Sequence, residues 1–329
     1  MMNYNNFKDA VVEKFKDYLS EEYQDMELRL YSTQRINMNM DAISLVPSGP
    51  EKNVSPVIYI NQMFDDYLKT EDLEGVLQRA AYRLENAFKH IPTIGKFDDF
   101  DSAKNNIVFQ VVNTIQNEDM LTDMPHREFQ DLSIIYRRIV KLDEQGIQSI
   151  MVNNNIAKML GMNEEQLYNC AFENTKRILP PTVKRLSDVL NDVVTEMSME
   201  TVEMTDSIPD DMTLWVISNN RGVNGAGSIL YEDVIHELAT KIGSDLYILP
   251  SSIHECLAIS IRAGDPYELA QMVNEVNMSE VDLDERLSNQ VYYYNKEERY
   301  LSLATDTPNK RLDGIIYDNE FVHRAGKSK

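Results

Sequence analysis

Residues 246–261 read Leu-Tyr-Ile-Leu-Pro-Ser-Ser-Ile-His-Glu-Cys-Leu-Ala-Ile-Ser-Ile, and this stretch decides the fold class. The apolar runs 246–249 and 257–261 are separated by a Pro-Ser-Ser segment that is typical of a turn, so both runs are predicted to be β-strands. Apolar residues at helical spacing precede them over residues 232–242 and follow them over residues 266–276. Strands and helices therefore alternate at short intervals in this part of the chain.

The same alternation extends in both directions from this stretch. Upstream, a helix is predicted over residues 163–177, where Asn163 and Gln166 have the spacing of a capping box. Downstream, the runs 291–295 and 299–304 are predicted to form a hairpin. Because the elements interleave without a strict period, the sequence favours an α+β fold with mixed sheets over a doubly wound parallel sheet. Other strand candidates are 107–112, 132–140, 149–152, 213–218 and 228–231.

The first part of the chain has a pattern of its own. Amphipathic helices are predicted over residues 6–19 and 71–89, with a small antiparallel strand meander between them. An acidic linker follows around residues 98–101. We therefore predict an N-terminal domain over 1–95, a larger mixed α/β domain over 104–304 and a flexible basic tail over 305–329. The strands of the meander are predicted at 26–33, 40–46 and 57–60.

The composition limits the classes of partner. The chain has 329 residues with 43% hydrophobic residues, enough for a large core, and its net charge of −22 repels nucleic acid and anionic lipid. No apolar stretch approaches the roughly twenty residues of a membrane span, and no secretion signal is expected. The chain has two cysteines, which are too few for a disulfide framework. We expect a cytoplasmic protein with a protein partner, preferably a basic one. Nothing in the sequence indicates an oligomeric state.

Two His-Glu dipeptides are the most suggestive candidates for chemistry. His236-Glu237 lies on a predicted helix, and His254-Glu255 follows a predicted strand. Imidazole and carboxylate groups are common zinc ligands, and histidine is the commonest general base, so these four residues are the candidate metal ligands and His254 and Glu255 are candidate catalytic residues. Neither dipeptide extends to the HExxH pattern, so hydrogen-bonded structural histidines remain the alternative.

Two further segments contain candidate catalytic residues. His126, in Pro125-His126-Arg127-Glu128, is predicted to lie in a loop, where it could serve as a base or an anion contact. Ser251 and Ser252 lie close to His254 and suggest a nucleophile with its base. A nucleophile elbow, however, needs glycines on both sides of the serine, which are absent here, so a serine-rich turn is the alternative.

A glycine-containing segment and an acidic segment complete the candidates. Residues 219–228 carry three glycines and Arg221 after a strand, but strand-like residues follow them, so a hairpin connection is favoured over an anion site. Residues 187–212 contain eight acidic residues and no basic one, at a spacing that places a one-sign stripe on a helix. This stripe and the methionines near it predict either a solvated face or a partner surface. The residues concerned are Asp188, Asp192, Glu196 and Glu200, with Met197, Met199, Met204 and Met212.

Three segments carry a resemblance to known proteins: Pro125-His126-Arg127, Glu173-Asn174-Thr175 and Ile248-Leu249-Pro250-Ser251-Ser252-Ile253-His254-Glu255. With them, the chain resembles an uncharacterised family of gut-dwelling Firmicutes and, more distantly, is similar to the YtpQ-type family over most of residues 1–304. The resemblance implies a cytoplasmic bacterial protein with a mixed α/β body. It implies no activity, cofactor or catalytic residue.

Two functional hypotheses follow from these observations. The first is a non-enzymatic interaction or regulatory protein, because no catalytic or cofactor-binding motif is complete. No cofactor is expected. The second is a hydrolase-like enzyme in which His254 and Glu255, with His236 or His126, act as base, acid or metal ligands.

Overall fold

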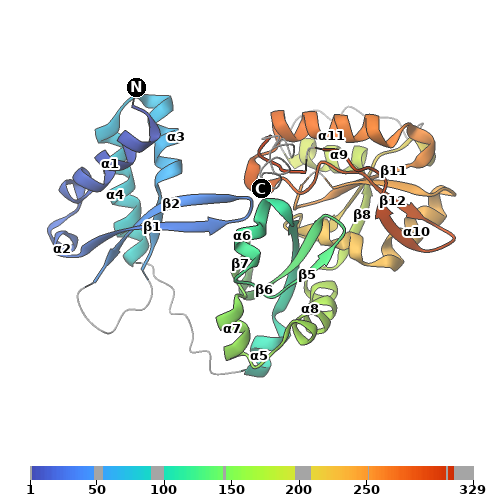
Figure 1. The fold of residues 1–329 in the computed structure, drawn as a ribbon, viewed down its shortest axis with the longest axis horizontal. Helices are drawn as coiled ribbons and strands as arrows, with labels where there is room; N and C mark the ends of the chain where they lie inside the picture. Colours follow the sequence, from blue (N-terminus) through green and yellow to red (C-terminus); the bar gives the residue numbers. More distant parts are fainter. Residues whose placement is uncertain are drawn as a thin grey trace, which may run out of the picture. The chain divides into compact units, whose positions relative to one another are not determined.

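The chain divides into two compact units, Met1–Asp98 and Asp99–Lys329 (Figure 1). Each unit has its own hydrophobic core, so we describe each by itself. The computed structural model describes residues 2–47, 55–89, 100–143, 146–196, 209–250, 252–308 and 310–314. Several predicted features lie outside them: Ser251, Glu200, Met197, Met199, Met204, residues 98–99 of the linker and residues 315–329 of the tail.

The first unit contains the predicted strand meander. Strands β1 and β2 form an antiparallel hairpin from the pair Glu27–Val46 to the pair Arg35–Met38, and β3 adds to β2. The helices pack their apolar residues against one face of this sheet, as their three- and four-residue spacing predicts. The elements are α1 (Tyr4–Lys14), a 3₁₀ turn (Phe15–Tyr18), α2 (Glu21–Gln24), β1 (Glu27–Arg35), β2 (Met38–Val46), β3 (Val57–Tyr59), α3 (Ile60–Thr70) and α4 (Leu73–Lys89).

Helix α3 was not predicted from the sequence. The run Val57–Ile60 has the composition of a strand, and it does form β3, but helix α3 begins at Ile60 directly after it. Ile60, Met63 and Tyr67 recur at helical spacing and are buried. A short apolar run cannot reveal where a strand ends and a helix begins, because both structures bury such residues.

The second unit is built from two antiparallel sheets. The first has six strands in the order β13-β12-β10-β11-β9-β8, and the second has four, β4-β6-β5 with β7 paired to β6. All strand pairings recorded among the described residues are antiparallel, which confirms the predicted α+β class. The strands are β4 (Ile107–Asn113), β5 (His126–Phe129), β6 (Leu132–Asp143), β7 (Gly146–Met151), β8 (Pro181–Arg185), β9 (Trp215–Asn219), β10 (Leu246–Leu249), β11 (Cys256–Ser260), β12 (Tyr292–Asn295) and β13 (Tyr300–Leu303).

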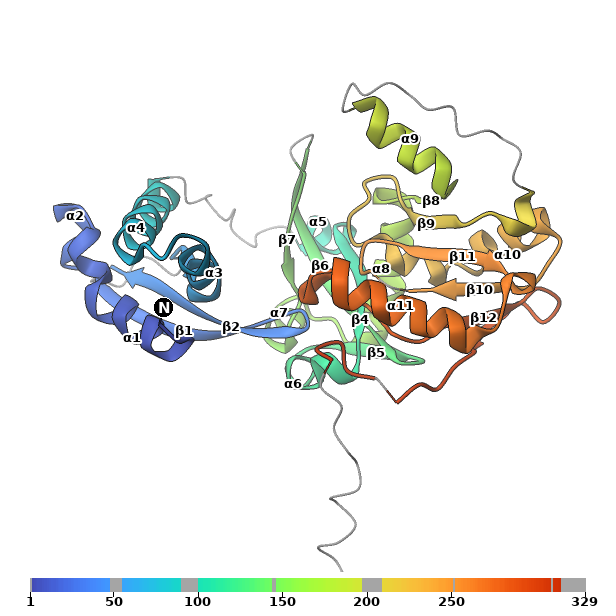
Figure 2. The same cartoon turned by 90° about the horizontal axis from the view of Figure 1, so that it is seen from above.

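Helices cover both faces of the six-stranded sheet. Helix α10 packs on the face that carries Trp215 and Ile217, whereas α9 and α11 lie over the opposite face (Figure 2). The capping box predicted at Asn163 and Gln166 is present at the start of α8. The helices are α5 (Phe100–Asn105), α6 (Glu118–Leu121), α7 (Asn154–Met159), α8 (Glu164–Ile178), α9 (Leu186–Glu196), α10 (Glu232–Ile242) and α11 (Pro266–Glu280), with 3₁₀ turns η2 (Ile115–Asn117), η3 (Asp210–Met212), η4 (Gly225–Leu230), η5 (Ile261–Ala263) and η6 (Leu283–Glu285).

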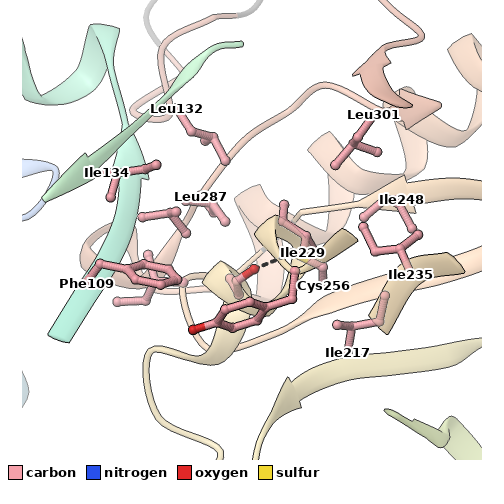
Figure 3. Close-up of a cluster of buried hydrophobic side chains, with 14 of the residues drawn as sticks. Phe109, Leu132, Ile134, Ile217, Ile229, Ile235, Ile248, Cys256, Leu287 and Leu301 are labelled. Atoms are coloured by element: carbon pink, nitrogen blue, oxygen red, sulfur yellow. Dashed lines mark hydrogen bonds between the residues drawn. The ribbon is translucent and has the colours of Figure 1, made fainter. Parts of the chain in front are cut away.

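The main core lies between the two sheets of the second unit. Figure 3 shows Phe109, Leu132 and Ile134 from the four-stranded sheet on one side, and Ile217 and Ile248 from the six-stranded sheet on the other. All five side chains are buried. At about 1.5–3 kcal/mol for each large aliphatic or aromatic side chain, this contact holds the two sheets together as one body.

Two local predictions in this unit are corrected, and a third is confirmed with an additional strand. Residues 225–230 form the 3₁₀ turn η4 rather than a strand, and this turn leads directly into α10, so the glycine segment is not a hairpin connection. Residues 126–129 form strand β5, so His126 lies in a strand rather than in a loop. The helix that was predicted to stop before Pro180-Pro181 does end at Ile178, and strand β8, which was not predicted, begins at Pro181.

Residues 305–308 and 310–314 are packed against the rest of the second unit. Thr305 is buried, and its side chain accepts a hydrogen bond from the backbone of Val291 at 2.9 Å. The backbone N–H of Leu312, whose side chain is buried, donates to Gln116 at 3.0 Å. These contacts extend the folded body beyond residue 304, where the sequence pattern predicted the beginning of a tail. Within the described ranges, no helix has the length and apolar character that a bilayer span requires.

Candidate functional site

A pocket of about 600 Å³ lies on the α9 side of the six-stranded sheet. Its floor comes from β8, β9 and β11, whose register sets Lys184 and Leu257 on either side of Val216. Leu186 and Val189 of α9 form the wall above this floor. The middle of the pocket is therefore apolar and the residues at its ends are polar, a composition typical of ligand-binding sites.

One end of the pocket carries Glu255. Side chains two residues apart in a strand point to the same face, so Ser218 lies beside Val216 and Glu255 beside Leu257. Asn220 and Gly222, from the loop that follows β9, complete this end. We call the cavity the Glu255 pocket; it is lined by Thr182, Lys184, Leu186, Val189, Val216, Ser218, Asn219, Asn220, Gly222, Glu255 and Leu257.

The loop after β9 is held by its own hydrogen bonds and by close packing. Asn219 accepts a hydrogen bond from the backbone of Arg221 and donates one to the carbonyl of Val223, both at 2.9 Å. Asn224 has a positive φ of 54°, a backbone conformation that asparagine tolerates better than most residues. A Cβ at Gly225 would lie 2.7 Å from both the backbone N of Asn219 and the carbonyl oxygen of His254, so only glycine fits there.

His254 ties this loop to the rest of the unit. Its Nδ1 accepts a hydrogen bond from the backbone N–H of Asn224 at 3.1 Å, and its Nε2 lies 3.3 Å from Glu285. Because Nδ1 accepts, the neutral ring carries its proton on Nε2, where it faces the Glu285 carboxylate. The carbonyl of His254 also accepts from Gly225 and Ser218. Both ring nitrogens are therefore engaged within the protein.

Glu255 forms no ion pair with a lysine or arginine among the described residues, and the one positive charge that acts on it is that of His254 when this ring is protonated. Burial raises the pKa of its carboxyl group, and the negative charge of Glu285 raises it further. The charge of His254 and a hydrogen bond from Ser252 act in the opposite direction without reversing the shift. The carboxyl group therefore lies at the end of an apolar pocket in an environment that disfavours its charge.

Of the two serines that the sequence places close to His254, Ser252 lies among the described residues. Ser252 is buried, and its hydroxyl accepts a hydrogen bond from the backbone N–H of His254 at 3.0 Å. That bond involves the main chain of His254, while the imidazole contacts Asn224 and Glu285. The hydroxyl and the ring are consequently not hydrogen-bonded to each other.

The other candidate residues lie in different environments. His236 Nδ1 is 3.3 Å from the hydroxyl of Tyr294, and Glu237 lines a separate cavity of about 390 Å³ on the α10 side of the sheet. His126 Nδ1 donates to the carbonyl of Met124 at 2.9 Å. In the described parts of the chain, no three His, Cys, Asp or Glu side chains are grouped so that they could hold a metal ion.

The acidic stripe is partly described. Asp192 of α9 accepts from Lys184 at 2.9 Å, so Lys184, which lies in the row beside Glu255, is already paired. Strand β8 and the inner residues of α9 were missed as site residues. The only signal in the sequence was the apolar side of the acidic helix, at Leu186 and Leu190, and it does not identify what that side covers.

The comparisons with known proteins agree with the extent of the fold. A family model matches residues 4–296, a range that contains strands β1 to β12 and the whole Glu255 pocket. The chain belongs to DUF5688, a family of unknown function. No curated protein and no solved structure matches the chain. Membership of DUF5688 therefore supplies no site residues, and the chemistry of the pocket has to be argued from its own side chains.

Proposed function

We propose that this member of DUF5688 is a non-enzymatic binding protein that recognises a basic protein partner by accepting one of its lysine side chains in the Glu255 pocket. One observation carries this proposal. The only acidic residue that lines the pocket, Glu255, lies at the polar end of an apolar cavity and pairs with no lysine or arginine among the described residues. A carboxylate in such a place is stabilised when a ligand brings the missing positive charge.

The shape of the pocket suits a lysine. The lysine stem is a flexible chain of four methylene groups that packs on apolar surfaces while its ammonium group remains polar. Val216, Leu257 and Val189 offer such a surface, and Glu255 follows in the next row of the sheet. A lysine that enters over the apolar middle of the pocket would reach the carboxylate with its ammonium group.

The charge of the chain supports a basic partner. A net charge of −22 attracts basic surfaces and increases their rate of encounter, especially at low salt. Asp188 and Asp192 on α9 add negative charge beside the pocket. The long-range field would bring the partner close, and the Glu255 pocket would select one side chain.

The contacts of His254 support binding rather than turnover. A general base needs a free lone pair directed at the substrate, but Nδ1 accepts from Asn224 and Nε2 faces Glu285. The imidazole would have to release the Asn224 loop before it could accept a proton. We therefore assign His254 a positioning role for the loop at the end of the pocket.

We further infer that the protein is cytoplasmic. Its two cysteines, Cys170 and Cys256, are both free thiols, and a disulfide-free chain of this kind fits a reducing compartment. Fractionation of host cells should recover the protein with the cytoplasmic proteins. Recovery from the secreted fraction would contradict this location.

The proposal is tested with a tetralysine peptide and the same peptide acetylated at every Nζ. Calorimetric titration should detect binding of tetralysine and at least tenfold weaker binding of the acetylated peptide, since acetylation removes the charge that Glu255 would pair with. The variant Glu255→Gln keeps the shape of the side chain and should weaken tetralysine binding at least tenfold. Glu237→Gln, in the separate α10 cavity, is the matched control and should leave binding unchanged.

Three results would overturn the proposal. Equal binding of both peptides would show that charge is not recognised. Unchanged binding by Glu255→Gln would place the lysine elsewhere on the acidic surface. Tighter binding of a tetra-arginine peptide than of tetralysine would assign the pocket to guanidinium groups instead.

A further inference from the structure

A second cavity, of about 230 Å³, also lies in the second unit, and Glu255 does not line it. It is formed between strand β5 of the four-stranded sheet and the β12–β13 hairpin of the six-stranded sheet. Arg127 contributes from the first of these and Arg299 from the second. Aromatic rings from both sheets and from helix α8 complete the wall, namely Phe129, Tyr168, Tyr294 and Tyr300. We call this cavity the two-arginine pocket.

Each arginine is held by a glutamate that also accepts a hydrogen bond from a tyrosine. On the β5 side, Arg127 donates from Nε and Nη2 to the two carboxylate oxygens of Glu164 at 3.0 and 2.9 Å. The hydroxyl of Tyr136 donates to the same Oε1 at 2.6 Å. The guanidinium also stacks 3.9 Å above the ring of Tyr168. Its position is therefore fixed by three separate contacts.

The hairpin side repeats this arrangement with the same connectivity. Arg299 donates from Nε to Oε1 of Glu232 at 2.7 Å and from Nη2 to Oε2. The hydroxyl of Tyr294 donates to Oε1 at 2.6 Å. Since that hydroxyl hydrogen is used, the 3.3 Å contact with His236 requires Nδ1 of His236 to donate to the Tyr294 oxygen. Two Tyr-Glu-Arg groups thus flank one cavity.

The geometry leaves the same part of each guanidinium free. The carboxylate takes Nε and one hydrogen of Nη2, so the Nη1 group and the second Nη2 hydrogen remain as donors. The hydrogen bonds from both arginines to their glutamates use Nε and Nη2 and not Nη1, and Arg299 also interacts with the hydroxyl of Tyr294. A guanidinium anchored in this way loses little freedom when it binds an oxyanion through its other edge.

Arg299 also occupies an unusual backbone position. Its φ is 53°, in the left-handed region that glycine and asparagine adopt at lower free energy than arginine. The turn between β12 and β13 would accommodate glycine better there. The arginine therefore contributes a side chain to the cavity at the expense of backbone strain, and such strain is typical of functional positions.

We infer that the two-arginine pocket binds a small planar aromatic carboxylate. The two guanidinium edges supply the paired donors that a carboxylate accepts, and the aromatic walls supply faces for a ring. The cavity is smaller than the roughly 300 Å³ at which pockets for drug-sized ligands begin, so a ligand with one ring suits it. Glu128 also lines the pocket but is exposed to solvent, which screens its charge.

Benzoate is the probe for this inference, with benzamide and acetate as matched controls. Calorimetric or NMR titration should give saturable binding of benzoate and at least tenfold weaker binding of benzamide, which lacks the charge, and of acetate, which lacks the ring. Arg299→Gly should weaken benzoate binding at least tenfold while thermal unfolding shows a folded protein, because glycine relieves the strained φ. Glu128→Gln should strengthen benzoate binding about twofold by removing a like charge.

Several outcomes would overturn the inference. They are the absence of saturable benzoate binding, equal binding of benzoate and benzamide, or wild-type affinity in the folded Arg299→Gly variant. The Glu255→Gln variant should bind benzoate as the wild type does, because Glu255 does not line this pocket. The test is therefore independent of the lysine proposal.

Discussion

The Glu255 pocket and the two-arginine pocket both place glutamates beside a cavity, but the fold treats these carboxylates in opposite ways. Glu164 and Glu232 each accept from an arginine and a tyrosine, and the pKa of each is lowered. At Glu232 the bond from Arg299 is the main cause, while at Glu164 burial acts against the shift and the bonds from Arg127 and Tyr136 outweigh it. Glu255 has no such partners, and burial raises its pKa.

This difference shows which groups the fold has left for a ligand. In the two-arginine pocket the carboxylates are satisfied, and the unused donors belong to the arginines. In the Glu255 pocket the carboxylate itself is the unpaired group. The first pocket is therefore built to accept an anion and the second to accept a cation, although the chain as a whole is strongly acidic.

The largest expected effect comes from Gly225, because it packs closely against the backbone of the segments that carry the end of the Glu255 pocket. Gly225→Ala places a Cβ 2.7 Å from two backbone atoms that cannot move aside easily, and we expect a loss of about 3 kcal/mol in the free energy of unfolding. Urea unfolding measures it. Gly222→Ala is the control; its Cβ meets open space at a φ of 63°, so about 1 kcal/mol is expected from backbone strain alone. Equal losses would contradict the packing argument.

The comparison predicts that Gly225→Ala also separates the two pockets functionally. If the variant remains folded at low temperature, it should lose tetralysine binding and keep most of its benzoate binding, since the η4 turn supplies only Ile229 and Leu230 to the two-arginine pocket and both arginines come from β5 and the hairpin. Loss of both activities in a folded variant would show that the pockets are coupled.

A glutamate substitution in the two-arginine pocket should have the next largest effect. Glu164→Gln removes the charge that holds Arg127 and one acceptor for Tyr136, and we expect a loss of about 2 kcal/mol. Chemical denaturation at neutral pH measures it. Glu165→Gln, at the next and exposed position, should change stability by less than about 0.5 kcal/mol. A loss of similar size in both variants would mean that the Arg127 pair contributes little.

The corresponding substitution at Glu255 should increase the free energy of unfolding instead of decreasing it. Glu255→Gln removes a charge that burial disfavours, so we expect a gain of about 0.5–1 kcal/mol at pH 8, reduced by the partial exposure of the group. A gain in stability together with a loss of tetralysine binding is typical of a binding residue. Destabilisation by Glu255→Gln would indicate a structural partner for the carboxylate.

The smallest expected effect is the change with pH in the stability difference between each glutamate variant and the wild type. The raised pKa of Glu255 means that its favourable contribution is fully present below the unfolded pKa near 4.5 and is lost as the pH rises through the folded value. The lowered pKa of Glu164 has the reverse consequence: its contribution is present above the unfolded pKa and is lost as the pH falls through the folded value. Unfolding experiments from about pH 4 to pH 8 should therefore show that the stability gained by Glu255→Gln grows with pH. The stability lost by Glu164→Gln should become smaller in acid.

The sequence by itself determined the elements whose signals are local. The capping box at Asn163 and Gln166, the hairpin around residues 291–304 and the N-terminal meander all follow from spacing within a few residues. Among the elements that were missed, α3, β8 and η4 have short apolar runs that suit more than one structure, and packing against neighbouring elements selected one of these structures.

The sites depended on tertiary structure to a greater degree. The sequence identified His254 and Glu255 as notable, but the partners that define their roles, Asn224 and Glu285, lie about thirty residues away on either side. Glu232 and Arg299 are separated by 67 residues and meet only because the hairpin returns beside α10. A hydrogen bond requires atoms within about 3 Å of each other, and only the packing of sheets and helices sets distances between such remote residues.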